Sequence, residues 1–166
     1  YRALARHLGA PEGSFRLDLA VGAAPRERAR AALAATGLPA DRRYAVLCPF
    51  TTRPQKHWFE DRWQALAPRL QAAGLVPVLL GGPGDAEAAA RIAAGAPGLL
   101  NLAGALKLDE SVAAIEGAAL LVGVDTGLTH MGTALGVPTL ALFGSTCPYR
   151  DPLAPRSRVL YEALPC

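Results

Sequence analysis

A turn with an acid, a hydroxyl group, a glycine and a histidine is the segment of this sequence best suited to chemistry. Asp125, Thr126 and Gly127 follow an apolar run at residues 118–122 that is typical of a buried strand, and His130 lies about one helical turn further on. Free backbone N–H groups and the positive end of a helix dipole would favour an anion, so we expect phosphate to bind at this turn. The same residue types also serve as ordinary turn and N-cap residues, and His130 could be a half-buried helix histidine.

A second polar segment follows the first predicted strand, at residues 44–48. Thr51 and Thr52 offer two hydroxyl groups and Lys56 offers a point charge, a combination that suits a phosphorylated ligand. The alternative is a solvated connecting loop, with Trp58 packed beneath the helix that follows it.

Residues far apart in the sequence should meet at one edge of the predicted sheet. Thr51, Gly82, Asp125 and Gly144 each follow a different predicted strand, and the carboxyl ends of parallel strands form the edge where ligands bind. Gly144 would allow a close backbone approach. The glycine-rich turn around Gly82 is neither G-x-G-x-x-G nor a Walker A motif. We interpret it as room for a base or sugar, with Glu87 near enough to bond a ribose hydroxyl.

The elements that must position these residues alternate at short spacing. This alternation predicts an α/β fold, a Rossmann-like parallel sheet flanked by helices. Pro68 falls inside the apolar pattern of the second helix and should kink or interrupt it. Residues 15–21 alternate like a strand or an extended linker. We expect strands at residues 44–48, 75–80, 99–102, 119–124 and 138–143, and helices at residues 26–36, 60–73, 85–94, 108–117 and 131–135.

The composition indicates a folded globular chain and excludes several classes of protein. Of the 166 residues, 51% are hydrophobic and 19% are charged, which argues against disorder. No apolar run approaches the roughly 20 residues that span a bilayer. The net charge of +3 comes from scattered arginines, which gives little support to nucleic-acid binding and fits an anionic ligand or an acidic membrane surface equally well.

The termini and the cysteines favour a piece of a cytoplasmic protein. The first residues do not resemble a signal peptide, and the chain does not begin with methionine, so we interpret it as a segment of something longer. The three cysteines show no metal-binding spacing, which predicts a reducing compartment. Cys48, inside a predicted strand, is interpreted as a small buried hydrophobe.

Taken together, these segments resemble the carboxyl-terminal half of the bacterial heptosyltransferases, the lipopolysaccharide-core glycosyltransferases of glycosyltransferase family 9, which have a GT-B fold. The resemblance covers roughly residues 40–165 and is specific as a set of blocks in the right order. The blocks that carry it lie at residues 49–58, 100–104, 124–130, 134–138 and 142–144.

The resemblance implies a division of the chain and a donor substrate. Residues 1–40 would be an interdomain linker and a helix from the amino-terminal half, and residues 41–166 would be the donor-binding Rossmann-like domain. The donor would be a nucleotide-sugar, usually ADP-heptose, and the acceptor a lipopolysaccharide-core or related glycolipid. The enzyme would act in the cytoplasm, with peripheral contact at the inner membrane, and would need neither a cofactor nor a metal ion.

The resemblance also implies roles for single residues. Lys56 would stabilise charge on the leaving diphosphate, and Glu87 would contact the ribose. The general base would be an acid in the amino-terminal domain. The donor-binding residues implied by the resemblance are Thr51, Thr52, Lys56, Glu87, Asp125, Thr126, Gly127, His130 and Gly144.

Two departures from the family pattern leave the donor and acceptor open. Phe59 stands where the family commonly has proline, and residues 144–148 read Gly-Ser-Thr-Cys-Pro where it commonly has Gly-Pro-Thr-Asp-Pro, so an acid is lost. The alternatives are a nucleotide-binding module without transferase activity, and another GT-B-like enzyme such as a nucleotide-sugar epimerase.

Overall fold

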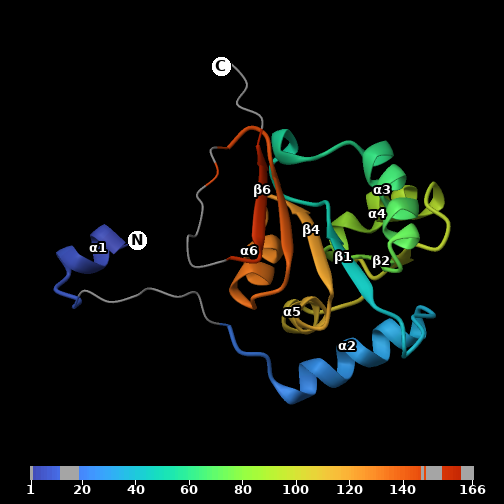
Figure 1. The fold of residues 1–166 in the computed structure, drawn as a ribbon, viewed down its shortest axis with the longest axis horizontal. Coiled ribbons are helices and arrows are strands. Elements are labelled where there is room, and N and C mark those ends of the chain that lie inside the picture. Colours follow the sequence, from blue (N-terminus) through green and yellow to red (C-terminus); the bar gives the residue numbers. More distant parts are fainter. Residues whose placement is uncertain (1, 12–18, 147, 149–154, 162–166) are drawn as a thin grey trace.

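The computed structural model describes residues 2–11, 19–146, 148 and 155–161. Within these residues the chain forms a six-stranded sheet in the order β3-β2-β1-β4-β5-β6, and every neighbouring pair of strands is parallel (Figure 1). Helices α2, α5 and α6 cover one face of the sheet, and α3 and α4 cover the other. The predicted α/β fold with a Rossmann-like parallel sheet is therefore confirmed.

The five predicted strands are present, with boundaries within one or two residues of those expected. The structure adds a strand that the sequence pattern did not reveal. This strand, β6, lies at the edge of the sheet and includes Arg158 and exposed Leu160, so it lacks the apolar run that marks a central strand. The strands are β1 Tyr44–Cys48, β2 Val76–Leu79, β3 Leu100–Asn101, β4 Leu120–Val124, β5 Thr139–Phe143 and β6 Ser157–Tyr161.

The predicted helices are also present, and two of them, α2 and α6, begin three and four residues earlier than expected. Helix α6 starts at Gly127, directly after the acid turn, so His130 lies within its first turns. Two short 3₁₀ helices, η1 at Pro54–Lys56 and η2 at Pro83–Asp85, follow β1 and β2. The α-helices are α1 Arg2–His7, α2 Ala23–Ala35, α3 Glu60–Ala72, α4 Ala86–Ala94, α5 Leu108–Glu116 and α6 Gly127–Ala134.

Strand β1 forms the centre of the core because helices cover it on both sides. All five of its residues are buried, as expected for a continuous apolar run in a parallel sheet. Alternate side chains enter different clusters: Val46 and Cys48 pack toward α2 and α5, and Ala45 and Leu47 pack toward α3 and α4. Cys48 is the small buried hydrophobe that we predicted, and burial raises the pKa of its thiol.

Pro68 does not interrupt α3, so the predicted interruption is wrong, while the alternative, a kink, stays a prediction. The proline lacks the N–H that would bond to the carbonyl group of Gln64, yet the helix continues to Ala72. Packing accounts for this. Trp63 is fully buried and meets Trp58 edge-on, with 5.2 Å between ring centroids. We attribute the continuous helix to the apolar surface that its core-facing side buries, which offsets the missing hydrogen bond.

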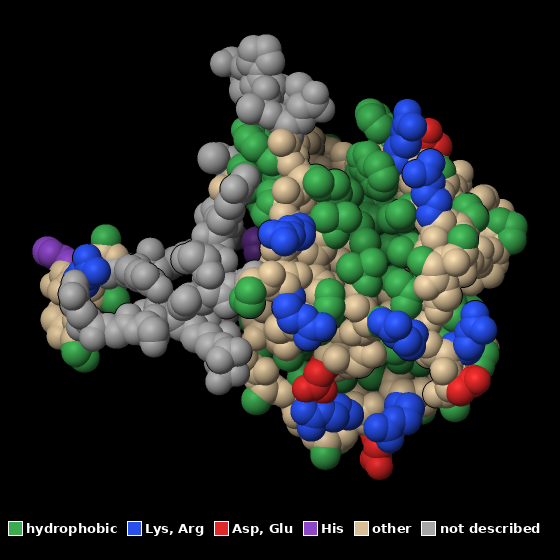
Figure 2. All heavy atoms as spheres, viewed as in Figure 1, with side chains coloured by type: hydrophobic (Ala, Val, Ile, Leu, Met, Phe, Trp, Pro, Cys, Tyr) green, Lys and Arg blue, Asp and Glu red, His purple; other side chains and the backbone are tan. Residues whose placement is uncertain are grey.

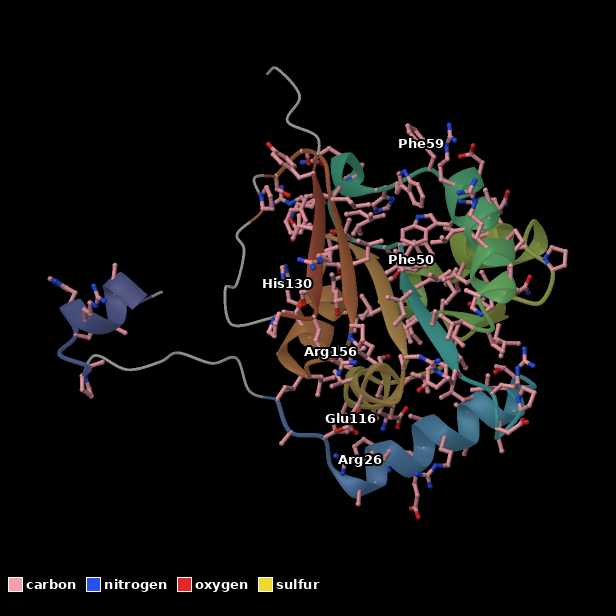
Figure 3. All side chains as sticks on the ribbon, in the orientation of Figure 1. Arg26, Phe50, Phe59, Glu116, His130 and Arg156 are labelled. Carbon is pink, nitrogen blue, oxygen red and sulfur yellow. The ribbon has the colours of Figure 1, made fainter. Side chains whose placement is uncertain are left out.

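Helix α2 packs on the body of the domain. Its Ala29 and Leu33 enter the core, and Arg26 binds Glu116 of α5 through two hydrogen bonds of 2.6 and 2.8 Å (Figure 3). The predicted division of the chain at residue 40 stays a prediction. Most of the segment predicted to be extended, at residues 15–21, lies outside the described residues.

The close packing of β4 against β1 and α6 leaves no room for a side chain at Gly123. A Cβ atom there would overlap the Thr129 hydroxyl and lie 3.0 Å from Cβ of Cys48. We therefore expect Gly123→Ala to lower the free energy of unfolding by about 1–3 kcal/mol, measured by urea denaturation. Gly84→Ala, where a Cβ would meet nothing within 4 Å, is the matched control.

A second variant separates overlap from a backbone effect. The Thr129 hydroxyl has no hydrogen-bond partner among the described residues. The double variant Gly123→Ala, Thr129→Ala should therefore recover part of the lost stability. Equal losses in the single and double variants would contradict the overlap.

Candidate functional site: a polar and apolar cavity at the strand switch point

The candidate site lies where the sheet changes its winding direction. From β1 the chain passes through α3 to β2 on one side, and from β4 it passes through α6 to β5 on the other side. The loops after β1 and β4 therefore diverge and leave a crevice at the carboxyl edge, the usual ligand site of such sheets. A cavity of about 680 Å³ occupies this crevice.

Most of the predicted site residues line this cavity. Seven of the nine do so, and they come from the loops after β1 and β4 and from α6: Thr51, Thr52, Lys56, Asp125, Thr126, Gly127 and His130. Of the four residues expected to meet from separate strand ends, Thr51, Gly82 and Asp125 line the cavity and Gly144 does not. The predicted contacts of the site residues with a donor stay predictions.

The Asp125 carboxylate organises the polar side of the cavity. Its Oδ2 atom accepts hydrogen bonds from Nζ of Lys56 at 2.5 Å and from Oγ1 of Thr146 at 2.8 Å. Its Oδ1 atom lies 3.1 Å from Nε2 of His130. The three partners belong to η1, the loop after β5 and helix α6. One carboxylate therefore links three separate segments.

These contacts keep Asp125 charged although its side chain is only 11% exposed. Burial alone would raise the pKa of Asp125, because the charged form loses hydration. Hydrogen bonds from Lys56, Thr146 and His130, together with the charge of Lys56, outweigh burial and lower the pKa below its ordinary value. The site thus contains a fixed carboxylate directly bound to a lysine.

The start of α6 supplies further groups for an anion. Thr126 is the N-cap residue, with an extended backbone and no capping hydrogen bond from its side chain. The first N–H groups of a helix have no partner within the helix, and the helix dipole adds positive potential. A Cβ atom on Gly127 would meet nothing within 4 Å, so the helix begins beside open space.

A histidine that we did not predict supports the loop after β1. Nε2 of His57 lies 2.8 Å from the carbonyl oxygen and 3.3 Å from the amide nitrogen of Thr51, six residues earlier. This contact closes the loop that carries Thr52 and Lys56. A histidine beside the candidate lysine was visible in the sequence, but its partner depends on the curvature of the loop.

The opposite side of the cavity is apolar and was only partly foreseen. Phe50 lies against Gly81, where a Cβ atom would be 2.6 Å from Cδ2 of the ring (Figure 3). Further apolar lining comes from the end of β2 and the turn after it and from the start of α5: Leu80, Pro83, Leu106 and Leu108. The glycine turn therefore makes room for an aromatic ring, beside the space that we predicted for a base or sugar.

Two predicted residues do not line the cavity. Glu87 is on α4, where its carboxylate binds Arg91 at 2.9 Å and its side chain is 92% exposed. Gly144 follows β5 and is exposed. The acid that does line the cavity near the glycine turn is Asp85, whose Oδ2 accepts the N–H of Gly82 at 2.8 Å. The ribose role of Glu87 stays a prediction.

The surface shows no single concentration of basic side chains on the face drawn in Figure 2, where Lys and Arg are separated by other residues. Among the described residues, no three His, Cys, Asp or Glu side chains are grouped as a metal ion would require. Within the same part of the chain, no helix is both long and apolar enough to cross a membrane.

A parallel sheet with a cavity at its switch point defines an α/β domain of the kind that binds ligands at the carboxyl ends of its strands. The family model of glycosyltransferase family 9 (heptosyltransferase) matches residues 1–166. Lipopolysaccharide heptosyltransferase 1 of Pseudomonas aeruginosa is 38% identical over 168 residues, a match that covers 97% of this chain and 44% of that protein. The chain belongs to glycosyltransferase family 9.

Solved structures share the fold of this chain. The heptosyltransferase WaaC of Escherichia coli, in a structure with ADP-2-deoxy-2-fluoro heptose, is 33% identical with a TM-score of 0.68, and the match covers 94% of this chain and 46% of that one. A family 9 glycosyl transferase from Veillonella parvula has a TM-score of 0.86 at 24% identity, covering 96% and 47%. The chain thus spans about half the length of the relatives it matches.

The lowered pKa of Asp125 predicts a pH-dependent contribution to stability. The unfolded chain protonates this aspartate near pH 3.9, roughly the ordinary value, while the folded chain protonates it only at lower pH. The contribution is therefore present at neutral pH and is lost as the pH falls from about 4 through the folded pKa. We expect Asp125→Asn to lower the free energy of unfolding by about 1–3 kcal/mol at pH 7.

The difference in the free energy of unfolding between the wild type and Asp125→Asn should shrink below about pH 4, as the wild-type carboxylate takes up its proton. Urea denaturation at a series of pH values measures it, with Asp41→Asn on the loop before β1 as the control. A difference that is constant from pH 7 to pH 3 would show that the charge of Asp125 is not what stabilises this cluster.

Proposed function

We propose that this chain is the donor-binding part of a heptosyltransferase and that it binds the nucleoside diphosphate of ADP-heptose. The observation that carries the proposal is the cavity at the switch point. One side of it has Lys56 and the start of α6 for a diphosphate, and the other has Phe50 and leucines for a base. The relative from E. coli in a structure with ADP-2-deoxy-2-fluoro heptose supports this choice of donor.

The proposed reaction is a direct displacement at the anomeric carbon of the sugar. An acceptor hydroxyl attacks, its proton passes to a base, and the bond from the anomeric carbon to the diphosphate oxygen breaks. The leaving diphosphate gains negative charge during this step. In this proposal Lys56 and the N–H groups at Thr126 and Gly127 stabilise that charge, so the reaction requires no bound metal ion.

Asp125 has a different role in this proposal. A carboxylate in direct contact with a diphosphate would be repelled by it. Asp125 instead orients His130 and keeps Lys56 beside the cavity until a diphosphate arrives, or it accepts a hydrogen bond from a sugar hydroxyl. The base that deprotonates the acceptor is proposed to be an acid in an amino-terminal Rossmann-like domain of the same protein, which would also bind the lipopolysaccharide-core acceptor at the cytoplasmic face of the membrane.

Calorimetry on this chain tests the choice of donor. We expect ADP to bind weakly but more tightly than UDP or GDP, and the chain alone to transfer no sugar. Lys56→Met should weaken ADP binding about tenfold or more, because a charged contact to the diphosphate is lost. Arg30→Met, on the exposed side of α2, removes a positive charge away from the cavity and serves as the control. Equal or absent binding of the three nucleotides would refute the proposed donor.

Kinetics of the complete enzyme that contains this chain test the division of roles between Lys56 and Asp125. Lys56→Ala should lower kcat as well as raise KM, with a total loss of about 2–4 kcal/mol of transition-state stabilisation. Asp125→Asn keeps shape and most hydrogen bonding, so it should cost less than Asp125→Ala. Loss of all activity in Asp125→Asn, with normal folding and donor binding, would mean that Asp125 itself transfers a proton.

A further inference from the structure

Thr146 contacts the centre of the site from a segment whose role is so far unassigned. This residue follows β5 and is half-buried, and its hydroxyl donates to Oδ2 of Asp125 at 2.8 Å across 21 positions of sequence. The acceptor atom, Oδ2, is the one that Lys56 also binds. Oδ2 of Asp125 thus has one charged and one neutral donor, each from a different loop.

The two donors cannot respond to a diphosphate in the same way. In the proposed function Lys56 must turn toward the phosphates, because an ammonium group is the mobile positive charge of the site. Oδ2 then loses its charged donor at the moment when negative charge arrives nearby. A neutral hydroxyl has no comparable attraction to the phosphates, so it can remain on the carboxylate.

We propose that Thr146 is a positioning residue that holds Asp125 in place and thereby releases Lys56 to the diphosphate. The inference rests on the proposed function and adds a residue to it. With Thr146 present, Oδ2 keeps a hydrogen bond after Lys56 leaves, and the carboxylate stays oriented toward His130. Without the hydroxyl, Oδ2 relies on its hydrogen bond from Lys56, and moving Lys56 away from Asp125 then costs more free energy.

The titratable and charged groups around Asp125 define what a titration of its carboxyl group would report. Lys56 faces it from η1 and His130 from α6, while Arg53 and Asp85 line the same cavity. A hydrogen bond to a carboxylate favours its charged form, so removal of the Thr146 hydroxyl must raise the pH at which Asp125 titrates. A residue that only filled space would not change that midpoint.

The first test measures the Asp125 carboxyl carbon by NMR across a pH titration of this chain. Thr146→Val, which keeps the shape of the side chain, should raise the midpoint by about half to one pH unit. Thr146→Ser should restore the wild-type midpoint, because the hydroxyl returns. Thr133→Val is the matched control, since that hydroxyl donates to the carbonyl group of Thr129 and not to Asp125. If folded Thr146→Val has an unchanged midpoint, the hydroxyl of Thr146 does not hold the carboxylate of Asp125 and the proposal is wrong.

The second test measures the binding of ADP by calorimetry in the same four proteins. Thr146→Val should weaken ADP binding about three- to tenfold, Thr146→Ser should bind like the wild type, and Thr133→Val should show no change. If the wild type binds no ADP, the proposed function fails and this inference fails with it. If the wild type binds ADP and Thr146→Val binds it equally well, the positioning role alone is wrong.

Discussion

A carboxylate removed from most of its water is the constraint on which the rest of the candidate site depends. Asp125 directly follows β4 and is partly buried, and a charge that has lost most of its water is costly unless it is paired and hydrogen-bonded. The structure compensates it with an ammonium group, a hydroxyl group and an imidazole from three separate segments. Each of these segments is therefore fixed relative to β4, and the cavity keeps a defined polar side.

The topology of the sheet explains why these segments can meet. Lys56 and Asp125 are 69 positions apart, but β1 and β4 are hydrogen-bonded neighbours, so the loops at their carboxyl ends begin side by side. The crossover helices α3 and α6 then lie on opposite faces of the sheet. The apolar side of the cavity follows from the same geometry, because the end of β2 and the start of α5 border the crevice.

Local sequence predicted the elements well where burial is strong. The strand at residues 44–48 and the helix that includes Trp63 were placed closely because their apolar spacing reflects the core directly. The pattern failed where tertiary packing outweighs local preference. Pro68 remains inside α3 because the buried face of that helix stabilises it. The edge strand β6 forms without an apolar run because it pairs with β5.

The sequence alone determined which residue types stand at the carboxyl ends of the strands, and this was enough to assemble the threonines, the lysine and the acid turn at one edge. Only the tertiary structure decided which side chains share the cavity. It placed Asp85 rather than Glu87 in the lining and brought Thr146 to Asp125. The physical reason is that periodicity reports which face of an element is buried, whereas a hydrogen bond between loops depends on distances of a few ångströms that the packing of the whole sheet sets.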